Sequence, residues 1–265
     1  MSPVDRLIGV GTFGTVRAFR DSASGRLTVH KTANSIDKNG DLEKEDGFLR
    51  RLGGRYVVER YDSFLGEDGL FTIVLEYSPA DLRMLMVQGG VGCFSLKRRL
   101  LFGILKGIEY IHSHQVAHND LRPENILVNE DYSVKICDFG MATQVDREYI
   151  EFNKRASARI RKDSNLRSKG ESEGAQPSNT ILTNLRYKSP ERLLGTNCTS
   201  DLFAGDMWSF GCIATEILTG ETLFNGKSEI DQLLSILRIV GVPEGKGLNY
   251  LSSLSSVSEV SKQGG

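Results

Sequence analysis

The first 75 residues alternate short apolar runs with turn residues, a pattern typical of strands in a small antiparallel sheet. The runs cover residues 7–8, 16–19, 27–29, 57–58 and 71–75. Between the third and fourth runs the apolar positions recur at helical spacing, which predicts one helix over residues 41–52. The positions that define this helix are Leu42, Glu45, Phe48, Leu49 and Leu52.

From residue 95 onward the hydrophobic pattern becomes helical. One long amphipathic helix is predicted between residues 96 and 111, and a second, more fully buried helix over residues 207–218. A β-rich half followed by an α-rich half predicts two lobes with a cleft between them.

Two segments break this pattern. Residues 147–170 contain eight Lys and Arg side chains and three acidic ones, and the chain then becomes rich in Glu, Gly, Ser and Pro. We expect a long, mobile, locally basic loop over residues 147–180. The last residues, 246–265, form a Ser-rich tail that we expect to be poorly ordered.

Composition and charge narrow the class of protein. The chain has 265 residues, 39% of them hydrophobic, and a net charge of −1, which argues against a general nucleic-acid binder or a polybasic membrane anchor. No apolar run approaches the roughly 20 residues that span a bilayer, and no apolar signal segment begins the chain. We expect a cytoplasmic or nuclear protein whose four cysteines are reduced.

Glycines between the first two predicted strands could bring the backbone close to phosphate oxygens. Gly9, Gly11 and Gly14 precede Val16, which could pack on a purine ring, although a plain hairpin would use glycines equally well. Lys31 on the third strand and Glu45 on the helix could pair and direct an ammonium group at phosphates. Two solvated surface charges are the alternative.

The run from His118 to Asn125, followed by Asp138, carries the most specific chemistry. Phosphoryl transfer needs a carboxylate that orients and accepts the proton of the attacking hydroxyl, a role for Asp120. It also needs oxygen ligands for Mg²⁺, which Asn125 and Asp138 would supply. The order, separation and position of these residues after a long helix favour a functional site.

On these residues the chain resembles the eukaryotic protein kinase family over residues 4–245. Ser189, Pro190 and Glu191 stand where the family has Ala-Pro-Glu, and residues 206–211 resemble its buried anchoring helix. Residues 224–233 and 240–243 are similar to the cyclin-dependent and mitogen-activated kinase branch.

The resemblance implies a bilobal α+β fold: a small antiparallel β-sheet lobe with one helix (4–77) and a larger, mainly helical lobe (78–245). Residues 147–180 would be an insert in the activation segment. Because the family continues with further helices after the position of Pro243, we expect the fold to be truncated at its carboxyl end.

The resemblance also implies ATP and Mg²⁺ as cofactors and transfer of the γ-phosphate to Ser or Thr of protein substrates. Arg122 would stabilise the γ-phosphate. Leu75 would be the gatekeeper, the backbone of Glu76 and Ser78 would face the adenine, and Asp81 would face the ribose. The side chains that would sandwich the ring are Ile8, Val16, Val29 and Leu127.

Several positions depart from the family pattern. Asn119 replaces the arginine that binds the phosphorylated activation loop, which suggests activity without that phosphate or a different clamp. Arg122 replaces a lysine, Asn184 replaces a threonine, and Val29 replaces an alanine over the adenine.

The helix bearing Glu45 lacks a cyclin-binding sequence, so the sequence does not support an activating subunit such as a cyclin. A pseudokinase that acts as a nucleotide-binding or scaffolding module is the alternative function.

Overall fold

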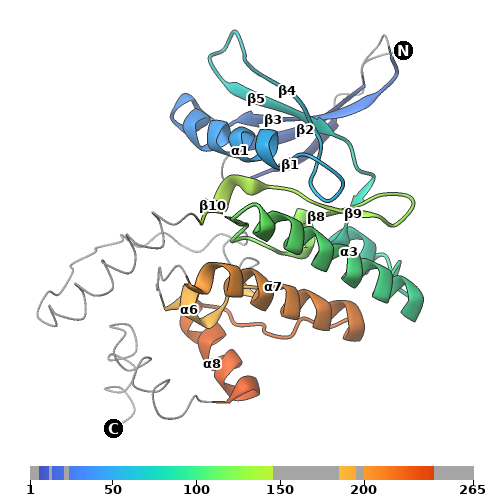
Figure 1. Cartoon of the computed structure of the whole chain (residues 1–265), viewed down its shortest axis with the longest axis vertical. Coiled ribbons are helices and arrows are strands. Elements are labelled where there is room, and N and C mark those ends of the chain that lie inside the picture. Colours follow the sequence, from blue (N-terminus) through green and yellow to red (C-terminus); the bar gives the residue numbers. More distant parts are fainter. Residues whose placement is uncertain (1–5, 12–13, 21–23, 146–184, 195–199, 242–265) are drawn as a thin grey trace, which may run out of the picture. The chain divides into compact units, whose positions relative to one another are not determined.

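The computed structural model describes residues 6–11, 14–20, 24–145, 185–194 and 200–241, and Figure 1 shows their ribbon. The chain divides into two compact units, Met1–Val145 and Asp146–Gly265. The predicted lobe boundary at residues 77/78 lies inside the first unit and stays a prediction. The predictions for residues 147–180, Asn184 and 246–265 fall outside the described residues.

A five-stranded antiparallel sheet begins the first unit. Its strands are β1 (Arg6–Val10), β2 (Gly14–Arg20), β3 (Leu27–Ala33), β4 (Arg60–Leu65) and β5 (Phe71–Glu76), in the spatial order β1-β2-β3-β5-β4. Four of these strands, all but β4, contain apolar runs that predict them. The run at residues 57–58 was predicted as a strand of this sheet, and that prediction is wrong. Val57 and Val58 are instead a buried connection, in which Val58 N donates to Ile136 O at 2.9 Å.

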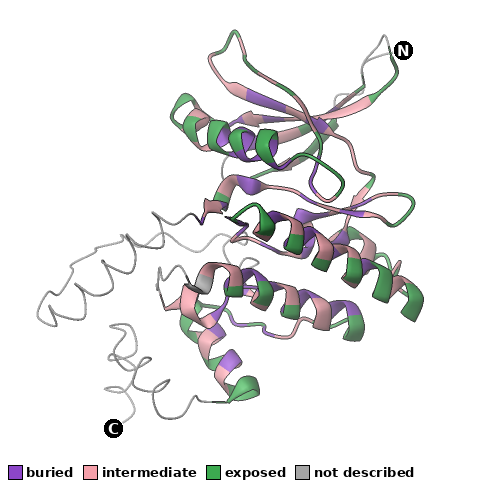
Figure 2. Ribbon diagram, in the orientation of Figure 1, coloured by how far each residue is buried: buried purple, intermediate pink, exposed green. Residues whose placement is uncertain are grey.

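One helix packs on this sheet. A short 3₁₀ turn (Ile36–Lys38) leads into α1 (Asn39–Leu52), which begins two residues before the predicted start. Figure 2 shows α1 with one buried and one exposed face. Leu42, Leu49 and Leu52 on the buried face are at most 2% exposed, and burial of such side chains contributes about 1.5–3 kcal/mol each.

The rest of the first unit carries the loops that hold the candidate site. After β6 (Ala80–Asp81) and α2 (Leu82–Val87), the predicted long helix is α3 (Phe94–Ser113). The following elements are β7 (Val116–Ala117), a 3₁₀ turn (Pro123–Asn125), β8 (Ile126–Val128), β9 (Val134–Ile136), a second 3₁₀ turn (Phe139–Met141) and β10 (Thr143–Gln144). Strands β6, β8 and β9 form one small sheet, and β7 pairs with β10.

Two glycines let β9 approach α3 closely. A Cβ at Gly103 would lie 2.6 Å from Val134 Cγ2, and one at Gly107 would lie 2.9 Å from Ile136 Cδ1. Side chains there would push the β8–β9 hairpin off the helix. The loops on either side of this hairpin are thereby fixed against a helix whose Leu100, Ile104 and Ile111 are completely buried.

The second unit contains α6 (Pro190–Leu193), α7 (Ser200–Thr219) and α8 (Glu229–Val240). The second predicted helix is α7, which the structure extends at its amino end. The prediction that it is more fully buried is confirmed only in part, because Met207 and Leu218 are 43% and 47% exposed. A buried hydrogen bond from Tyr187 Oη to Glu216 Oε2, 2.6 Å long, ties the segment before α6 to α7. In the described part of the chain, no helix is both long and apolar enough to cross a bilayer.

Candidate active site

Strand β3 and helix α1 bring Lys31 and Glu45 together. Lys31 Nζ lies 2.7 Å from Glu45 Oε2 and also 2.7 Å from Asp138 Oδ1, so one ammonium group joins two carboxylates. The Lys31 and Glu45 side chains are 10% and 1% exposed. The alternative of two solvated surface charges is therefore wrong for this pair.

Burial and charge act in opposite directions on this cluster. Burial alone would lower the pKa of Lys31, but the carboxylates of Glu45 and Asp138 outweigh it and raise that pKa. Burial raises the pKa of Glu45, and the nearby ammonium opposes this rise. Against its own burial, the Lys31 charge holds the pKa of Asp138 below the ordinary value. Lys31 is thus charged and Asp138 ionised at neutral pH.

The loop after β7 presents Asp120 and Asn125. Asn125 Nδ2 donates to Asp120 O at 2.8 Å and to Asp120 Oδ2 at 3.1 Å, which fixes the carboxylate within the loop. Burial raises the pKa of Asp120, while the positive charge of Arg122 opposes the rise. A raised pKa brings a carboxylate closer to the range in which a general base accepts a proton efficiently.

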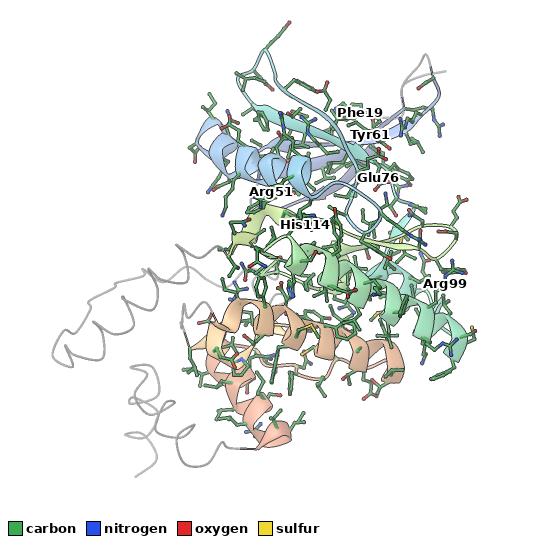
Figure 3. All side chains as sticks on the ribbon, viewed as in Figure 1. Phe19, Arg51, Tyr61, Glu76, Arg99 and His114 are labelled. Carbon is green, nitrogen blue, oxygen red and sulfur yellow. The ribbon has the colours of Figure 1, made fainter. Side chains whose placement is uncertain are left out.

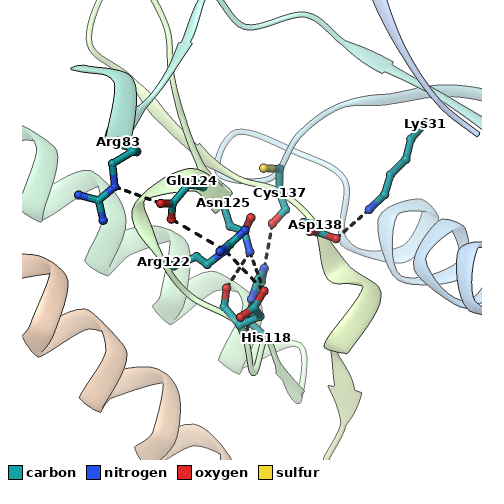
Figure 4. Close-up of polar contacts among 9 residues, drawn as sticks. Lys31, Arg83, His118, Arg122, Glu124, Asn125, Cys137 and Asp138 are labelled. Carbon is teal, nitrogen blue, oxygen red and sulfur yellow. Dashed lines mark hydrogen bonds and ion pairs between the residues drawn. The ribbon is translucent and has the colours of Figure 1, made fainter. Parts of the chain in front are cut away.

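Arg122 lies beside this carboxylate and beside Glu124, and Figure 4 shows its contact with Glu124. Its Nε is 3.8 Å from Asp120 Oδ2 and 3.9 Å from Glu124 Oε2. Glu124 in turn accepts a hydrogen bond from Arg83 Nε at 3.0 Å, which links the loop to α2. The guanidinium therefore places positive charge within 4 Å of the proposed base.

His118 connects the two loops of the site. It is fully buried, its Nδ1 accepts from Asp120 N at 3.2 Å, and its Nε2 lies 2.9 Å from Cys137 O (Figure 4). Since Nδ1 is an acceptor, these partners assign the proton to Nε2, which donates to Cys137. Its ring also packs edge-on against Phe139, with centroids 4.9 Å apart.

Asp138 has an unusual backbone conformation. Its φ of 64° and ψ of 73° lie in the left-handed region, which is uncommon for residues other than glycine. Such strain persists only where the surroundings impose it and is frequent at functional sites. The surroundings here include the bond of Cys137 N to Asn125 O at 3.0 Å and the bond to Lys31.

The donor set suits Mg²⁺. Both hydrogen bonds of Asn125 to Asp120 use Nδ2, which leaves its amide oxygen as a donor atom for a cation, and Asp138 is ionised. Within the described ranges no cluster of three His, Cys, Asp or Glu side chains could hold a metal by itself. Mg²⁺ is usually held by one or two protein oxygens together with phosphate oxygens of the substrate, which agrees with two donors.

Four of the residues predicted to contact the nucleotide share one face of the main sheet. Val29 lies directly opposite Leu75, and Val16 directly opposite Lys31, so the strand register places all four side chains on the same face. This is the face from which Lys31 reaches Glu45 and Asp138. The prediction that these residues act together is consistent with this register.

The remaining predicted contacts lie on other elements. Ile8 is at a bulge of β1 and is 52% exposed, and Gly9 lies opposite Val16. Asp81 and Leu127 face each other across β6 and β8. Asp81 also caps α2, with Oδ1 accepting from Met84 N at 2.7 Å, and burial raises its pKa.

Two further predicted positions, one at the end of strand β5 and one just after it, have their side chains engaged. The carboxylate of Glu76, labelled in Figure 3, accepts from Lys135 Nζ at 2.6 Å and from Glu59 N at 2.7 Å. Ser78 Oγ donates to backbone oxygens of Ala80 and Val128. Their side chains are thus structural. Glu76 N is also engaged, since it donates to Glu59 O at 2.9 Å, and the backbone role predicted for these two residues stays a prediction.

The glycine-rich turn is tied to β3 by a residue that sequence reasoning missed. Asn34 Nδ2 donates to Gly11 O at 2.9 Å, and Thr15 Oγ1 donates to Asn34 Oδ1 at 2.9 Å. At Gly14 a Cβ would lie 2.7 Å from Thr32 O, so this glycine is required by close packing. In the sequence, the only indication of this role is that Asn34 is an amide residue directly after a strand.

Asn119 holds the segment after Asp138. With φ at 67°, it directs Nδ2 to Met141 O at 3.1 Å and to Thr143 Oγ1 at 3.0 Å. The same segment pairs through β10 with β7, and Arg51 at the end of α1 (Figure 3) donates to Gln144. The residue that replaces the family arginine is therefore itself a clamp between the two loops.

Comparisons with known proteins identify the family of this chain. The model of the protein kinase domain matches residues 3–263 of the chain. "Cell division control protein 2 homolog 3" from Trypanosoma brucei brucei is 30% identical over 263 residues, which cover 96% of this chain and 75% of that protein. Together with the antiparallel sheet, α1 and the helices after them, these matches confirm the predicted resemblance and fold class.

Proposed function

The chain belongs to the protein kinase family, and we propose that it is an active enzyme that phosphorylates serine or threonine of protein substrates. The observation that carries this proposal is a pair of side-chain groups in the first unit. Lys31 joins Glu45 and Asp138 at 2.7 Å, and Asn125 holds Asp120. A backbone bond from Cys137 N to Asn125 O, 3.0 Å long, links the loops that carry the two groups.

Lys31 and Glu45 position the nucleotide in this proposal. The buried ion pair fixes the ammonium over the sheet face that also carries Val29 and Leu75, where it can contact α- and β-phosphates. Asn125 and Asp138 would hold Mg²⁺. When bound, MgATP supplies the γ-phosphoryl group with its developing charge partly neutralised by the metal.

Asp120 would orient the substrate hydroxyl and accept its proton. Its raised pKa and its fixed geometry both suit this role. Arg122 would add positive charge near the transferred group, in place of the lysine of Ser/Thr kinases. Its planar guanidinium already lies within 4 Å of Asp120 and Glu124, so its charge is held close to the reacting atoms.

Serine and threonine specificity is supported by the resemblance of residues 183–191 to Ser/Thr kinases. An activating subunit such as a cyclin is not part of the proposal, because α1 carries no cyclin-binding sequence. Asn119 supports an enzyme that needs no activation-loop phosphate, since its amide bonds directly to Met141 and Thr143.

The test is transfer of labelled phosphate from MgATP to a generic basic protein, followed by phosphoamino-acid analysis. Wild-type protein should yield phosphoserine or phosphothreonine. Asp120→Asn, which keeps the size of the side chain, should lower the rate of transfer about 10²- to 10⁴-fold. Glu130→Gln removes an exposed carboxylate of the same unit and should leave the rate unchanged.

Two results would change the proposal. Phosphotyrosine as the product would overturn the specificity. Equal background incorporation by wild type and Asp120→Asn, with a nucleotide-dependent rise in melting temperature, would instead identify a pseudokinase.

A further inference from the structure

Helix α1 carries a second buried acid directly after Glu45. Asp46 is only 4% exposed, yet both of its carboxylate oxygens are engaged by arginines. Oδ1 accepts from Arg60 Nε at 2.7 Å, and Oδ2 accepts from Arg50 Nε at 2.6 Å. A buried carboxylate is costly unless it is paired in this way, and charge-assisted bonds of this length are strong.

Ser63 closes these contacts into a cluster. Its hydroxyl accepts from Arg60 Nη2 at 2.6 Å and from Arg50 Nη2 at 2.9 Å, and it lies 3.2 Å from Asp46 Oδ2. We name Asp46, Arg50, Arg60 and Ser63 the Asp46 cluster. Two of its members belong to α1 and two to β4, so the cluster joins the helix to the edge strand of the sheet.

Glu45 and Asp46 attach α1 to two different strands. Glu45 reaches Lys31 on β3, Asp46 reaches Arg60 on β4, and β5 lies between these strands. Consecutive residues of an α-helix point about 100° apart, so the two contacts hold separate sides of one turn. Any rotation of α1 that releases Asp46 from β4 therefore also moves Glu45 relative to Lys31.

We propose that Asp46 is a positioning residue, which acts through Arg60 and Ser63 to hold Glu45 in contact with Lys31. This role rests on the proposed kinase activity, because the contact it maintains is the one that directs Lys31 at the nucleotide. Asp46 itself touches no reacting group. The Asp46 cluster sets the rotation of α1, and the Lys31–Glu45 ion pair depends on that rotation.

The geometry of Arg60 is specific to a guanidinium. Its Nε and Nη2 bind two different acceptors, Asp46 and Ser63, at the same time. A lysine would keep the charge, but its ammonium lacks the fixed planar arrangement of Nε and Nη2 and cannot reproduce both of these bonds in the same geometry. Arg60→Lys therefore separates the positioning role from a purely electrostatic one.

The experiment measures kcat and KM for ATP and for the protein substrate in four variants. Asp46→Asn presents an amide nitrogen to one arginine, and Arg60→Lys and Ser63→Ala are milder changes that keep the cluster's net charge. Glu43→Gln is the matched control, because it removes one acidic charge from the exposed face of the same helix. Each variant is combined with Glu45→Gln in a double-mutant cycle.

Asp46→Asn and Arg60→Lys should lower kcat/KM for ATP by roughly 5- to 150-fold, the usual range of coupling between two sites. The KM for the protein substrate should not change, and Glu43→Gln should behave as wild type. In the Glu45→Gln background Asp46→Asn should add little, because the contact it maintains is already lost. If Asp46→Asn does not fold, Arg60→Lys and Ser63→Ala replace it in the same comparison of kcat/KM for ATP with and without Glu45→Gln.

Two outcomes would overturn the role of Asp46. One is a lower melting temperature with kcat/KM for ATP within twofold of wild type, which would leave the cluster a purely stabilising device. The other is full additivity with Glu45→Gln. If wild type transfers no phosphate, the proposed function fails separately. In that case crystal structures of the variants still test the role of Asp46. The distance from Lys31 Nζ to the Glu45 carboxylate should lengthen in Asp46→Asn and stay unchanged in Glu43→Gln.

Discussion

Replacement of Glu45 by Gln removes the charge that pairs with Lys31 and keeps the shape of the side chain. At 2.7 Å the pair has a Coulomb energy of about 6 kcal/mol for an effective dielectric constant of about 20. Desolvation offsets much of this energy, and the amide oxygen of Gln still accepts a hydrogen bond. The net loss is that of a charge-assisted hydrogen bond, about 1.5–3 kcal/mol.

Because Lys31 also contacts Asp138 at 2.7 Å, the ammonium of the Glu45→Gln variant moves toward that carboxylate and away from the phosphates. We expect kcat/KM for ATP to fall roughly 10- to 150-fold, which corresponds to that free energy. The assay is the initial rate of phosphate transfer at subsaturating ATP, with Glu43→Gln as the control. A rate for Glu45→Gln within twofold of wild type would refute the idea that the ion pair directs Lys31.

Three further substitutions have defined outcomes. Asn119→Asp tolerates the left-handed backbone but cannot donate to Met141 O, so the free energy of unfolding should fall by about 1–3 kcal/mol in thermal melts, together with the transfer rate. Arg122→Met removes a charge that lowers the pKa of Asp120; this pKa then rises, and the acid limb of the kcat/KM profile should move to higher pH. Gly14→Ala places a Cβ 2.7 Å from a carbonyl of β3 and should lower the melting temperature, at a cost of about 1–3 kcal/mol.

The hydrophobic pattern was sufficient to predict four strands of the main sheet and the helices α1, α3 and α7. It did not predict β4 or α8. It failed at Val57 and Val58, whose apolar side chains predict a strand. These residues are buried in a connection that bonds to Ile136, and only tertiary structure reveals such a partner. The short helix α2 was also missed, since its start depends on capping by Asp81 rather than on a long periodic pattern.

The residues of the candidate site could be predicted from the sequence more fully than the residues that hold them in place. Residue type and spacing alone indicate five of them: Lys31, Glu45, Asp120, Asn125 and Asp138. The structure places these residues in two groups of contacts, one around Lys31 and one between Asn125 and Asp120. The roles predicted for them stay predictions until activity is measured.

The supporting residues gave weaker signals in the sequence. Position 46 falls on the same helical face as Leu42 and Leu49, so Asp46 is expected to be buried. A buried carboxylate in turn indicates a buried partner of positive charge. The identity of that partner, Arg60 on a strand that follows later, could not be read from the spacing. Likewise the sequence shows that Asn119 replaces an arginine, whereas its bonds to Met141 and Thr143 emerge only from the fold.

The most direct test of the central claim is the ratio of phosphate-transfer rates for wild type and Asp120→Asn. Both proteins are compared at equal concentration with saturating MgATP and the same protein substrate. Loss of the base should lower the rate about 10²- to 10⁴-fold, the usual contribution of general acid–base catalysis. Equal rates in the two proteins would contradict the assignment of Asp120 and, with it, the account of this chain as an active kinase.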